Sequence, residues 1–179
     1  MNVVKYFSLV LLIGLAGISC SKERKNPYKL NAETARIDNI LSTSVFEDMD
    51  GREVKISDFK GKVVVVDFWE TWCGPCLMVF PAMDSLKTLY NNDFEIIAVN
   101  TLNSDSEEDV KEFIGHNNLK FNFVLDKNRV GEEVISLGIP FKVFIDPDGY
   151  VIKAEAGSYG TQSDFNKAKE IIEEYKSSK

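Results

Sequence analysis

The feature that most constrains this chain is a pair of cysteines two residues apart, in the run Trp72-Cys73-Gly74-Pro75-Cys76. Two thiols at this spacing at the start of a helix can close and reopen a disulfide. Unpaired N–H groups and aligned peptide dipoles at a helix N-terminus favour negative charge, so the first thiol should ionise more readily than a free cysteine. The pattern predicts Cys73 as a nucleophile and Cys76, one turn further in, as a resolving thiol.

A C-x-x-C pair can also be half of a zinc site, which needs two further ligands. The remaining cysteine is Cys20, far upstream, and the single histidine is His116. A Cys/His zinc site therefore cannot be completed within the sequence, and we expect redox chemistry with no metal and no other cofactor. His116 is remote in sequence from the cysteine pair and is expected at the surface.

The residues around the cysteine pair predict a strand, a turn and a helix. Residues 63–69, VVVVDFW, are typical of a strand buried on both faces. Residues 77–90 have the pattern of an amphipathic helix. Pro75 falls in the first turn, where a missing N–H does no harm, and Pro81 lies inside the helix and is expected to kink it.

This order of strand, redox turn and proline-containing helix resembles the thioredoxin superfamily. A second match is Gly138-Ile139-Pro140, followed by the strand-like run 141–146. It is similar to the cis-proline loop of that family, which implies that Pro140 is cis and that Ile139 presents its backbone to a bound substrate. The resemblance also implies substrate contacts by the residues of the redox turn, Trp72, Gly74 and Pro75. The alternative is a trans proline that opens an edge strand.

The segment between the redox helix and Pro140 is longer than in plain thioredoxins. An inserted helix with Ser106 as N-cap, a strand over 121–126 and a short helix over 131–137 would fill it. Residues 45–56 alternate around an Asp-Gly turn and predict a hairpin. These features resemble the TlpA/ResA-type proteins, which face the periplasm or the outer side of the bacterial inner membrane.

The predicted fold is therefore α/β, a thioredoxin-like domain over residues 44–179, with a central mixed sheet flanked by helices, an N-terminal β-hairpin and an inserted helix and strand. The 44% of hydrophobic residues is enough for one core. At the C-terminus, Ser163 and Asp164 are expected to cap a helix with one apolar stripe.

The N-terminus has the parts of a secretory signal, predicted over residues 1–19. Its apolar run, residues 6–18, is too short for the roughly 30 Å hydrocarbon core of a bilayer, so cleavage is expected. Cys20 after a small residue is similar to a bacterial lipoprotein processing site, which implies lipid on Cys20. Gly17 and the positive charges just after Cys20 depart from the usual pattern, and a soluble periplasmic product stays open. Residues 20–43 would then be anchor and tether, with a short helix over 33–41 as an option.

Two carboxylates near the cysteine pair invite different interpretations. A charged Asp67 within a buried strand would be costly, so it should be neutral or paired. The thioredoxin resemblance implies a buried proton acceptor for Cys76, and the alternative is a residue that reaches water. Glu70 is expected to be a solvated carboxylate that ends the strand, with tuning of Cys73 as the alternative. Trp72 and Phe141 either form apolar walls beside Cys73 or pack in the core.

The net charge of −7 argues against nucleic acid and against electrostatic docking on anionic lipid. The sequence as a whole predicts a thiol-disulfide oxidoreductase that reduces disulfides of exported proteins. From the resemblance, its partners would be those proteins, including cytochrome c maturation proteins, and a membrane thiol-reducing electron donor, with the chain a monomer. The alternatives are an oxidase or isomerase of exported proteins and a redox-inactive, lipid-anchored binding module.

Overall fold

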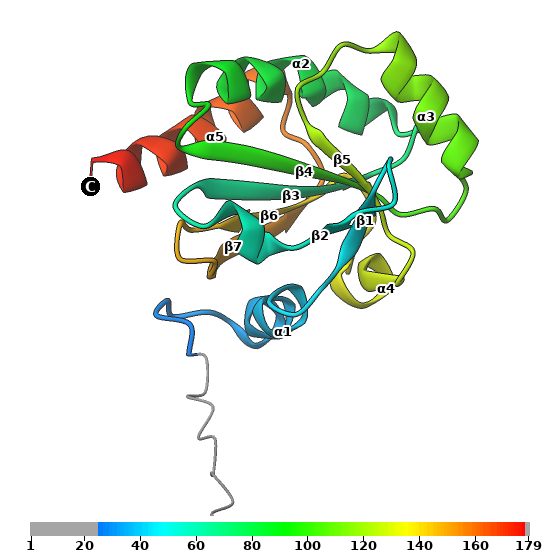
Figure 1. Cartoon of the computed structure of the whole chain (residues 1–179). Coiled ribbons are helices and arrows are strands. Elements are labelled where there is room, and N and C mark those ends of the chain that lie inside the picture. The colour runs from blue at the N-terminus through cyan, green and yellow to red at the C-terminus, as the bar shows by residue number, and fades with distance from the viewer. Residues whose placement is uncertain (1–24, 178–179) are drawn as a thin grey trace, which may run out of the picture.

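The computed structural model describes residues 25–177, which form an open sheet with helices on both faces (Figure 1). The predicted α/β class is confirmed. A 3-10 turn, η1 (Ile56–Phe59), precedes the central strand. In chain order the helices and strands are α1 (Ala32–Leu41), β1 (Phe46–Asp48), β2 (Glu53–Val54), β3 (Val63–Trp69), α2 (Gly74–Leu89), β4 (Phe94–Asn100), α3 (Glu107–His116), β5 (Asn122–Leu125), α4 (Val130–Val134), β6 (Phe141–Ile145), β7 (Val151–Ala156) and α5 (Thr161–Lys176).

The sheet is mixed, with strand order β2-β1-β5-β4-β3-β6-β7. Strand β3 pairs in parallel with β4, and β4 pairs in parallel with β5. The other pairings, including β3 with β6, are antiparallel. Parallel neighbours need long crossover connections, and α2 and α3 supply them. Strand β3 therefore lies between β4, to which α2 connects it, and β6, which begins directly after Pro140.

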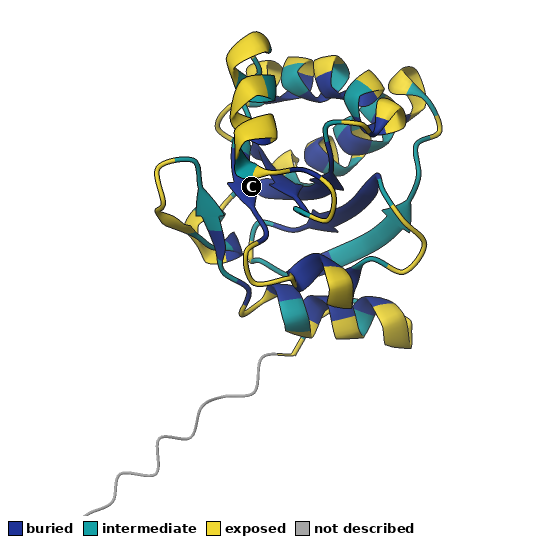
Figure 2. Ribbon diagram, turned by 90° about the vertical axis from the view of Figure 1, so that its right-hand side faces the viewer, coloured by how far each residue is buried: buried dark blue, intermediate teal, exposed yellow. Residues whose placement is uncertain are grey.

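The side chains of β3 alternate between two cores. Val65 and Trp69 face the core that is built with α2, α3 and α5. Val66 and Phe68 face the core that is built with α1 and α4. Because side chains two apart share a face of the sheet, Asp67 points to the α2 side. Figure 1 shows α2 and α5 on one side of the sheet and α1 and α4 on the other, and Figure 2 shows the buried residues on the helix faces turned to the sheet.

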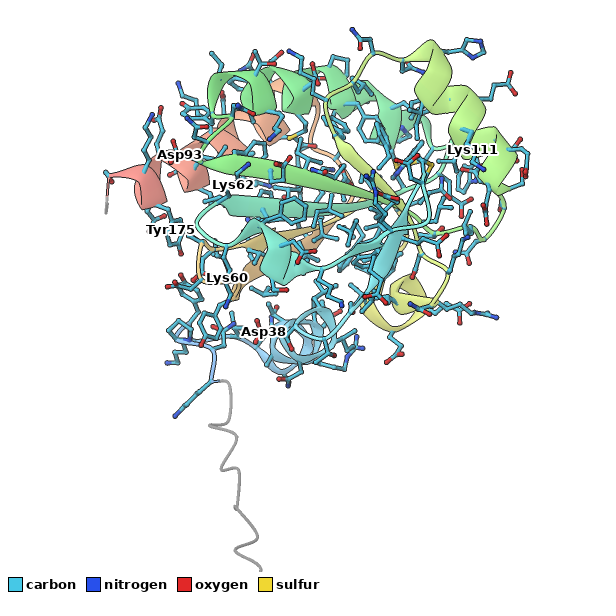
Figure 3. The ribbon with its side chains drawn as sticks, in the orientation of Figure 1. Asp38, Lys60, Lys62, Asp93, Lys111 and Tyr175 are labelled. Carbon is cyan, nitrogen blue, oxygen red and sulfur yellow. A yellow bond between two sulfur atoms is a disulfide. The ribbon has the colours of Figure 1, made fainter. Side chains whose placement is uncertain are left out.

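Helix α1 packs against the sheet in a segment that the sequence assigned to the 20–43 tether. Its Ile37 and Leu41, four residues apart on one helix face, are buried in the core. The Asp38 carboxylate accepts a hydrogen bond from the backbone N–H of Val151 at 2.8 Å. Figure 3 shows Asp38 on α1. The tether prediction is therefore wrong for this segment, and the optional short helix is the correct interpretation.

The folded domain also begins earlier than predicted, because the boundary predicted from the sequence was residue 44. The Tyr28 hydroxyl donates a hydrogen bond to Asp146 Oδ2 at 2.7 Å and is hydrogen-bonded to the Tyr175 hydroxyl. The predicted signal peptide and Cys20 lie outside the described residues. Within residues 25–177, no helix has the length and apolar character that crossing a bilayer requires.

The predicted insertion and hairpin are both present. Ser106 Oγ accepts a hydrogen bond from the N–H of Asp109 at 3.2 Å, and the Asp109 carboxylate accepts one from the N–H of Ser106 at 2.7 Å, which is the predicted capping box of α3. Strands β1 and β2 form the hairpin, with Gly51 at φ +82° in its turn. Helix α5 begins at Thr161, two residues before the predicted cap at Ser163, so the cap prediction is wrong.

Candidate active site

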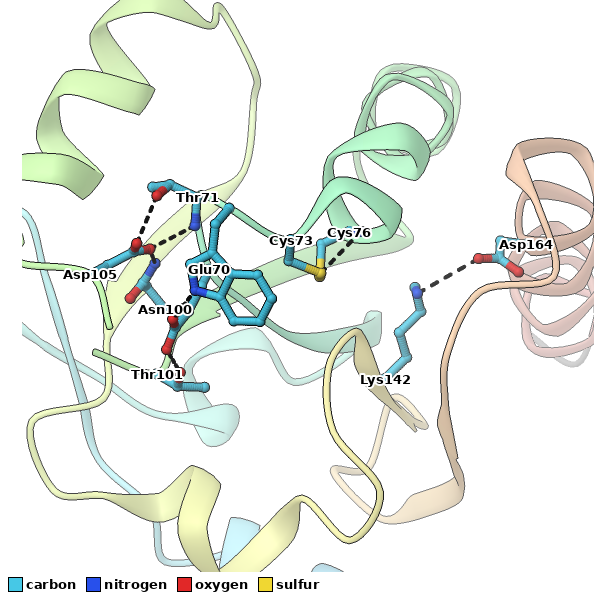
Figure 4. The surroundings of a disulfide bond; sticks show 10 residues. Glu70, Thr71, Cys73, Cys76, Asn100, Thr101, Asp105, Lys142 and Asp164 are labelled. Atoms are coloured by element: carbon cyan, nitrogen blue, oxygen red, sulfur yellow. Dashed lines mark hydrogen bonds and ion pairs between the residues drawn. A yellow bond between two sulfur atoms is a disulfide. The ribbon is translucent and has the colours of Figure 1, made fainter. Parts of the chain in front are cut away.

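Strand β3 leads directly into the redox turn, residues 70–73, and α2 begins at Gly74. Cys73 is the N-cap of α2, and its Sγ accepts a hydrogen bond from the N–H of Cys76 at 3.3 Å. Pro75 is the second helical residue, where no intrahelical hydrogen bond needs its missing N–H. Cys73 and Cys76 form a disulfide with Cα atoms 5.3 Å apart (Figure 4). The predicted cysteine pair is therefore present in its oxidised form at a helix N-terminus.

The cis-proline loop lies immediately before β6. The peptide bond between Ile139 and Pro140 is cis, so the predicted isomer is confirmed and the trans alternative is excluded. Gly138, just before this bond, has φ +100°, a backbone conformation that favours glycine. Since Phe141 pairs with Phe68 of β3, the loop lies at the same end of β3 as the redox turn.

A groove of about 440 Å³ adjoins the redox turn. Its apolar lining comes from Trp72, Ile135 and Ile139. The Trp72 side chain is 63% exposed, whereas Phe141 is buried and packs near Phe68 in the core on the other face of the sheet. Of the two aromatic walls considered for Cys73, Trp72 lines a surface groove and Phe141 is core packing.

Glu70 is buried, and the prediction of a solvated carboxylate is wrong. It is 1% exposed. Its Oε1 accepts hydrogen bonds from Thr101 Oγ1 and from the N–H groups of Asn103 at 2.9 Å and Ser104 at 3.3 Å. Its Oε2 accepts a hydrogen bond from Trp72 Nε1 (Figure 4). These donors offset the loss of water around the carboxylate, and they hold the indole that lines the groove.

Asp105, in the loop after β4, accepts hydrogen bonds from the redox turn, just as Glu70 of the redox turn accepts them from that loop. Its carboxylate accepts hydrogen bonds from the N–H and the Oγ1 of Thr71, each at 2.6 Å, and from Asn100 Nδ2 at 2.7 Å. Glu70 and Asp105, which we call the carboxylate clasp, therefore join the redox turn to the loop after β4 from both sides. Asp105 could not be predicted from the sequence, because a carboxylate in a polar loop belongs to no recognisable pattern.

Asp67 is buried, as predicted, on the sheet face that α2 covers. It is 1% exposed, and its Oδ1 has no hydrogen-bond partner among the described residues. Burial raises the pKa of Asp67 to about 6, while the Lys142 ammonium opposes this rise and the Asp164 carboxylate adds to it. The alternative of a side chain that reaches water is excluded.

Two charged side chains that the sequence analysis did not single out as site residues lie near Asp67. Lys142 is directly opposite Asp67 in the antiparallel β3–β6 pairing, so both point to the same face. Lys142 Nζ is 3.6 Å from Asp164 Oδ2, in the first turn of α5, and both side chains are buried. A signal for Lys142 was available, because it is a charged residue within an apolar strand, as Asp67 is.

The remaining residues considered for the site lie elsewhere. His116 is exposed in the last turn of α3. Within the part of the chain that the structure describes, no group of three or more His, Cys, Asp and Glu side chains is arranged to hold a metal ion.

Replacing Asp67 with Asn should raise the free energy of unfolding at pH 7 by about 2–3 kcal/mol, because the pKa of this carboxyl is raised from 3.8 to about 6 by folding. The unfolded chain loses the proton near pH 4, whereas the folded chain keeps it until about pH 6. The wild type therefore loses stability as the pH rises from about 4 to about 6. Below about pH 4 the free energy of unfolding of Asp67→Asn should no longer exceed that of wild type. Denaturant unfolding from pH 4 to pH 8 measures it.

The exposed Asp148 provides the matched control for this prediction. Asp148→Asn should change the free energy of unfolding little at any of these pH values. A stability difference between Asp67→Asn and wild type that stays constant from pH 4 to pH 8 would contradict the raised pKa of Asp67.

Comparison with known proteins agrees with this geometry. The Redoxin family model matches residues 36–172. Thiol-disulfide oxidoreductase ResA of Bacillus thuringiensis subsp. konkukian is 33% identical over 171 residues, which are 93% of this chain and 90% of that protein. The thioredoxin domain of a thiol-disulfide oxidoreductase from Bacteroides vulgatus matches with a TM-score of 0.61 at 28% identity, covering 72% of this chain and 92% of that one.

The exposed lipoprotein thioredoxin of Streptococcus pneumoniae matches with a TM-score of 0.58 at 26% identity, covering 71% of this chain and 98% of that one. The family model spans most of the sequence, and the solved structures share the fold of this chain. This chain belongs to the redoxin family and is a thiol-disulfide oxidoreductase of the TlpA/ResA type within the thioredoxin superfamily.

Proposed function

We propose that this oxidoreductase acts as a reductant, passing two electrons from a Cys73–Cys76 dithiol to disulfides of exported proteins. The observation that carries the exchange chemistry is the position of Cys73 as N-cap of α2, where the helix N-terminus stabilises the attacking thiolate. The reducing direction rests on the absence of positive charge between the cysteines. Substrates include, in this proposal, the proteins of cytochrome c maturation. Substrate would lie along Trp72, Gly74 and Pro75 of the redox turn and against the backbone of Ile139 before Pro140.

The reaction has two exchange steps. The Cys73 thiolate attacks one sulfur of the substrate disulfide, so that a mixed disulfide forms and the other substrate sulfur leaves as a thiolate, which takes a proton from water. Cys76 then attacks the Cys73 sulfur and displaces the second substrate sulfur, which is also protonated. Two electrons pass to the substrate, and the Cys73–Cys76 disulfide is the product left on the protein.

Asp67 is proposed as the general base of the second step. Its carboxylate takes the proton of Cys76, and the proton goes on to the departing substrate thiolate. A base is most effective when its pKa is close to the working pH, and the raised pKa of Asp67, about 6, moves it in that direction. The fold places Asp67 on the same side of the sheet as α2, which carries Cys76.

Cys73→Ser should abolish disulfide reduction, whereas Cys76→Ser should still attack and then stall as a mixed disulfide, because the resolving thiol is gone. Insulin reduction with dithiothreitol measures turnover, and mass spectrometry of trapped complexes identifies the cysteine that carries the adduct. Adducts found on Cys76 and never on Cys73 would reverse the assignment. Folded wild-type protein without turnover would favour the redox-inactive binding module.

The direction of electron flow follows from the charges around the redox turn. Gly74 and Pro75 between the cysteines carry no positive charge, and the buried Lys142 ammonium is already paired with Asp164. The helix N-terminus is then the main source of stabilisation for the Cys73 thiolate, which leaves the disulfide form comparatively favoured. Such a protein donates electrons readily, and it requires a membrane thiol-reducing donor to restore the dithiol.

The reduction potential should lie near the thioredoxin value of about −270 mV, and about 150 mV below that of a strong periplasmic oxidant. Equilibration with glutathione buffers, followed through the fluorescence of Trp69 and Trp72, gives the value. A potential above about −180 mV would place the protein with isomerases and oxidants and would overturn the reductant assignment.

We further propose that residues 1–19 are a cleaved signal peptide and that Cys20 is the lipid-modified N-terminus of a monomeric protein facing the periplasm. The name of the Streptococcus pneumoniae relative, an exposed lipoprotein, supports this proposal. Asn26 Nδ2 donates a hydrogen bond to the Val151 carbonyl at 3.0 Å, and five residues, 21–25, lie in sequence between Cys20 and this bonded residue. Their extended length is about 20 Å at most, which would keep the domain close to the bilayer.

Cys20→Ala should move the protein from the membrane fraction to the soluble periplasmic fraction, or leave it unprocessed, because the residue that would accept lipid is absent. Cell fractionation and mass spectrometry of the mature N-terminus measure the outcome. A wild-type mature protein that retains residues 1–19 contradicts the proposal.

A further inference from the structure

Three charged side chains on one face of the sheet each have a buried atom without the hydrogen bond that its burial would lead us to expect. Among residues 25–177, the buried side-chain nitrogen and oxygen atoms without a hydrogen-bond partner are Asp67 Oδ1, Trp69 Nε1, Lys142 Nζ and Asp164 Oδ2. Three of these four atoms belong to a cluster of two carboxylates and one ammonium, Asp67, Lys142 and Asp164, which we call the buried triad. The other carboxylate oxygen of Asp164, Oδ1, accepts a hydrogen bond from the N–H of Tyr159 at 3.2 Å. Buried charges without hydrogen bonds are costly, so such a cluster points to a role other than stability.

The three members of the triad come from three elements. Asp67 and Lys142 are directly opposite in the β3–β6 pairing, and Asp164 lies in the first turn of α5 with its Oδ2 3.6 Å from Lys142 Nζ. The exposed fractions of Asp67, Lys142 and Asp164 are 1%, 1% and 4%. Figure 4 shows the Lys142 and Asp164 side chains directed toward each other on one side of the disulfide, with Glu70 on the other side.

The neighbouring elements add no free charge to the triad. On β4 the residue opposite Asp67 is Ala98, and α2 contributes the cysteine pair. On β7 the residue opposite Lys142 is Glu155, whose carboxylate is bound by Lys167 at 2.8 Å and by Lys153 at 3.0 Å. The charges that act on Asp67 from within the core are therefore those of Lys142 and Asp164.

These two charges act on Asp67 with opposite signs. With Asp67 ionised, the triad carries two negative charges and one positive charge, whereas with Asp67 protonated it is neutral. Low dielectric in the core strengthens both interactions. The Lys142 ammonium favours the carboxylate form of Asp67, and the Asp164 carboxylate favours the protonated form.

We propose that Lys142 and Asp164 are positioning residues that set the proton affinity of Asp67 in opposite directions, and thereby the pH at which Asp67 accepts the proton of Cys76. The catalytic part of this inference rests on the proposed role of Asp67 as general base. Asp164 has a second effect, because it keeps a partner beside the Lys142 ammonium when Asp67 is protonated.

Charge-removing variants of the two residues should move the titration of Asp67 in opposite directions. Lys142→Met keeps the length of the side chain and should raise the midpoint by about one pH unit, whereas Asp164→Asn should lower it by about one pH unit. The double variant should lie between the two single variants. A purely structural role would destabilise the fold in each case without producing opposite shifts.

Two measurements test this, the first on the reduced full-length protein and the second on its mixed disulfide with a small thiol. The first is the pH titration of the ¹³C carboxyl resonance of Asp67, identified by its absence in Asp67→Asn. The second is the pH profile of release of a small thiol from its mixed disulfide with Cys73, measured in a single turnover. Glu155→Gln is the matched control, because the Glu155 carboxylate lies in the same cross-strand row but is paired with two lysines. In this variant the titration midpoint of Asp67 should equal that of wild type.

The two measurements separate the possible failures. Midpoints of the carboxyl titration that move in the same direction in both variants, or stay at the wild-type value, overturn the inference. If the carboxyl titration moves as expected while thiol release is unchanged in Asp67→Asn, the base role in the proposed function fails and the electrostatic inference stands. If Lys142→Met does not fold, Asp164→Asn alone decides, since a midpoint that is not lowered contradicts the proposal.

Discussion

Burial of β3 on both faces is the constraint on which the redox turn, the buried triad and the groove all depend. A shift of one residue in the β3 register would replace Asp67 by Val66 on the α2 side. Antiparallel pairing with β6 brings the cis-proline loop to the end of β3 that carries the redox turn. Parallel pairing with β4 brings the loop after β4 to that same edge, because the carboxyl ends of parallel strands meet there. Three segments distant in sequence thus meet around Cys73.

The carboxylate clasp and the buried triad are two contrasting ways to bury acidic groups beside one disulfide. Each clasp carboxylate accepts several hydrogen bonds, and these fix the redox turn against the loop after β4. In the triad, one polar atom of each side chain has no hydrogen bond, and Lys142 Nζ lies 3.6 Å from Asp164 Oδ2, whose partner oxygen accepts a hydrogen bond from the N–H of Tyr159. A satisfied carboxylate suits a positioning role, whereas an unsatisfied one has a proton affinity that its neighbours can shift.

Sequence alone predicted what is encoded locally. The cysteine pair, the helix that follows it and the cis proline were predicted correctly because each belongs to a short motif. Glu70 was predicted incorrectly because three of its four hydrogen-bond donors come from residues 101–104, more than thirty positions away, and no local sequence pattern indicates them. Lys142 lies opposite Asp67 because of the β3–β6 register, which sequence periodicity does not specify. The helix over 32–41 was assigned to a tether because its apolar face is short, with Ile37 and Leu41 as its buried apolar residues.

Reduction of the disulfide adds negative charge to this site when Cys73 ionises. The dithiol form adds a thiolate at Cys73, in a region that already holds the carboxylates of the clasp and of the triad, with Lys142 as the buried positive charge near them. Like charges raise the free energy of the reduced form, and the N-terminus of α2 lowers it. In this chain the helix terminus is a property of the fold, whereas the acidic charges come from individual side chains. In the proposed function, the direction of electron flow therefore depends on the balance between two effects on the Cys73 thiolate. The helix N-terminus, which the fold fixes, stabilises it, and the nearby acidic side chains, which single residues supply, destabilise it.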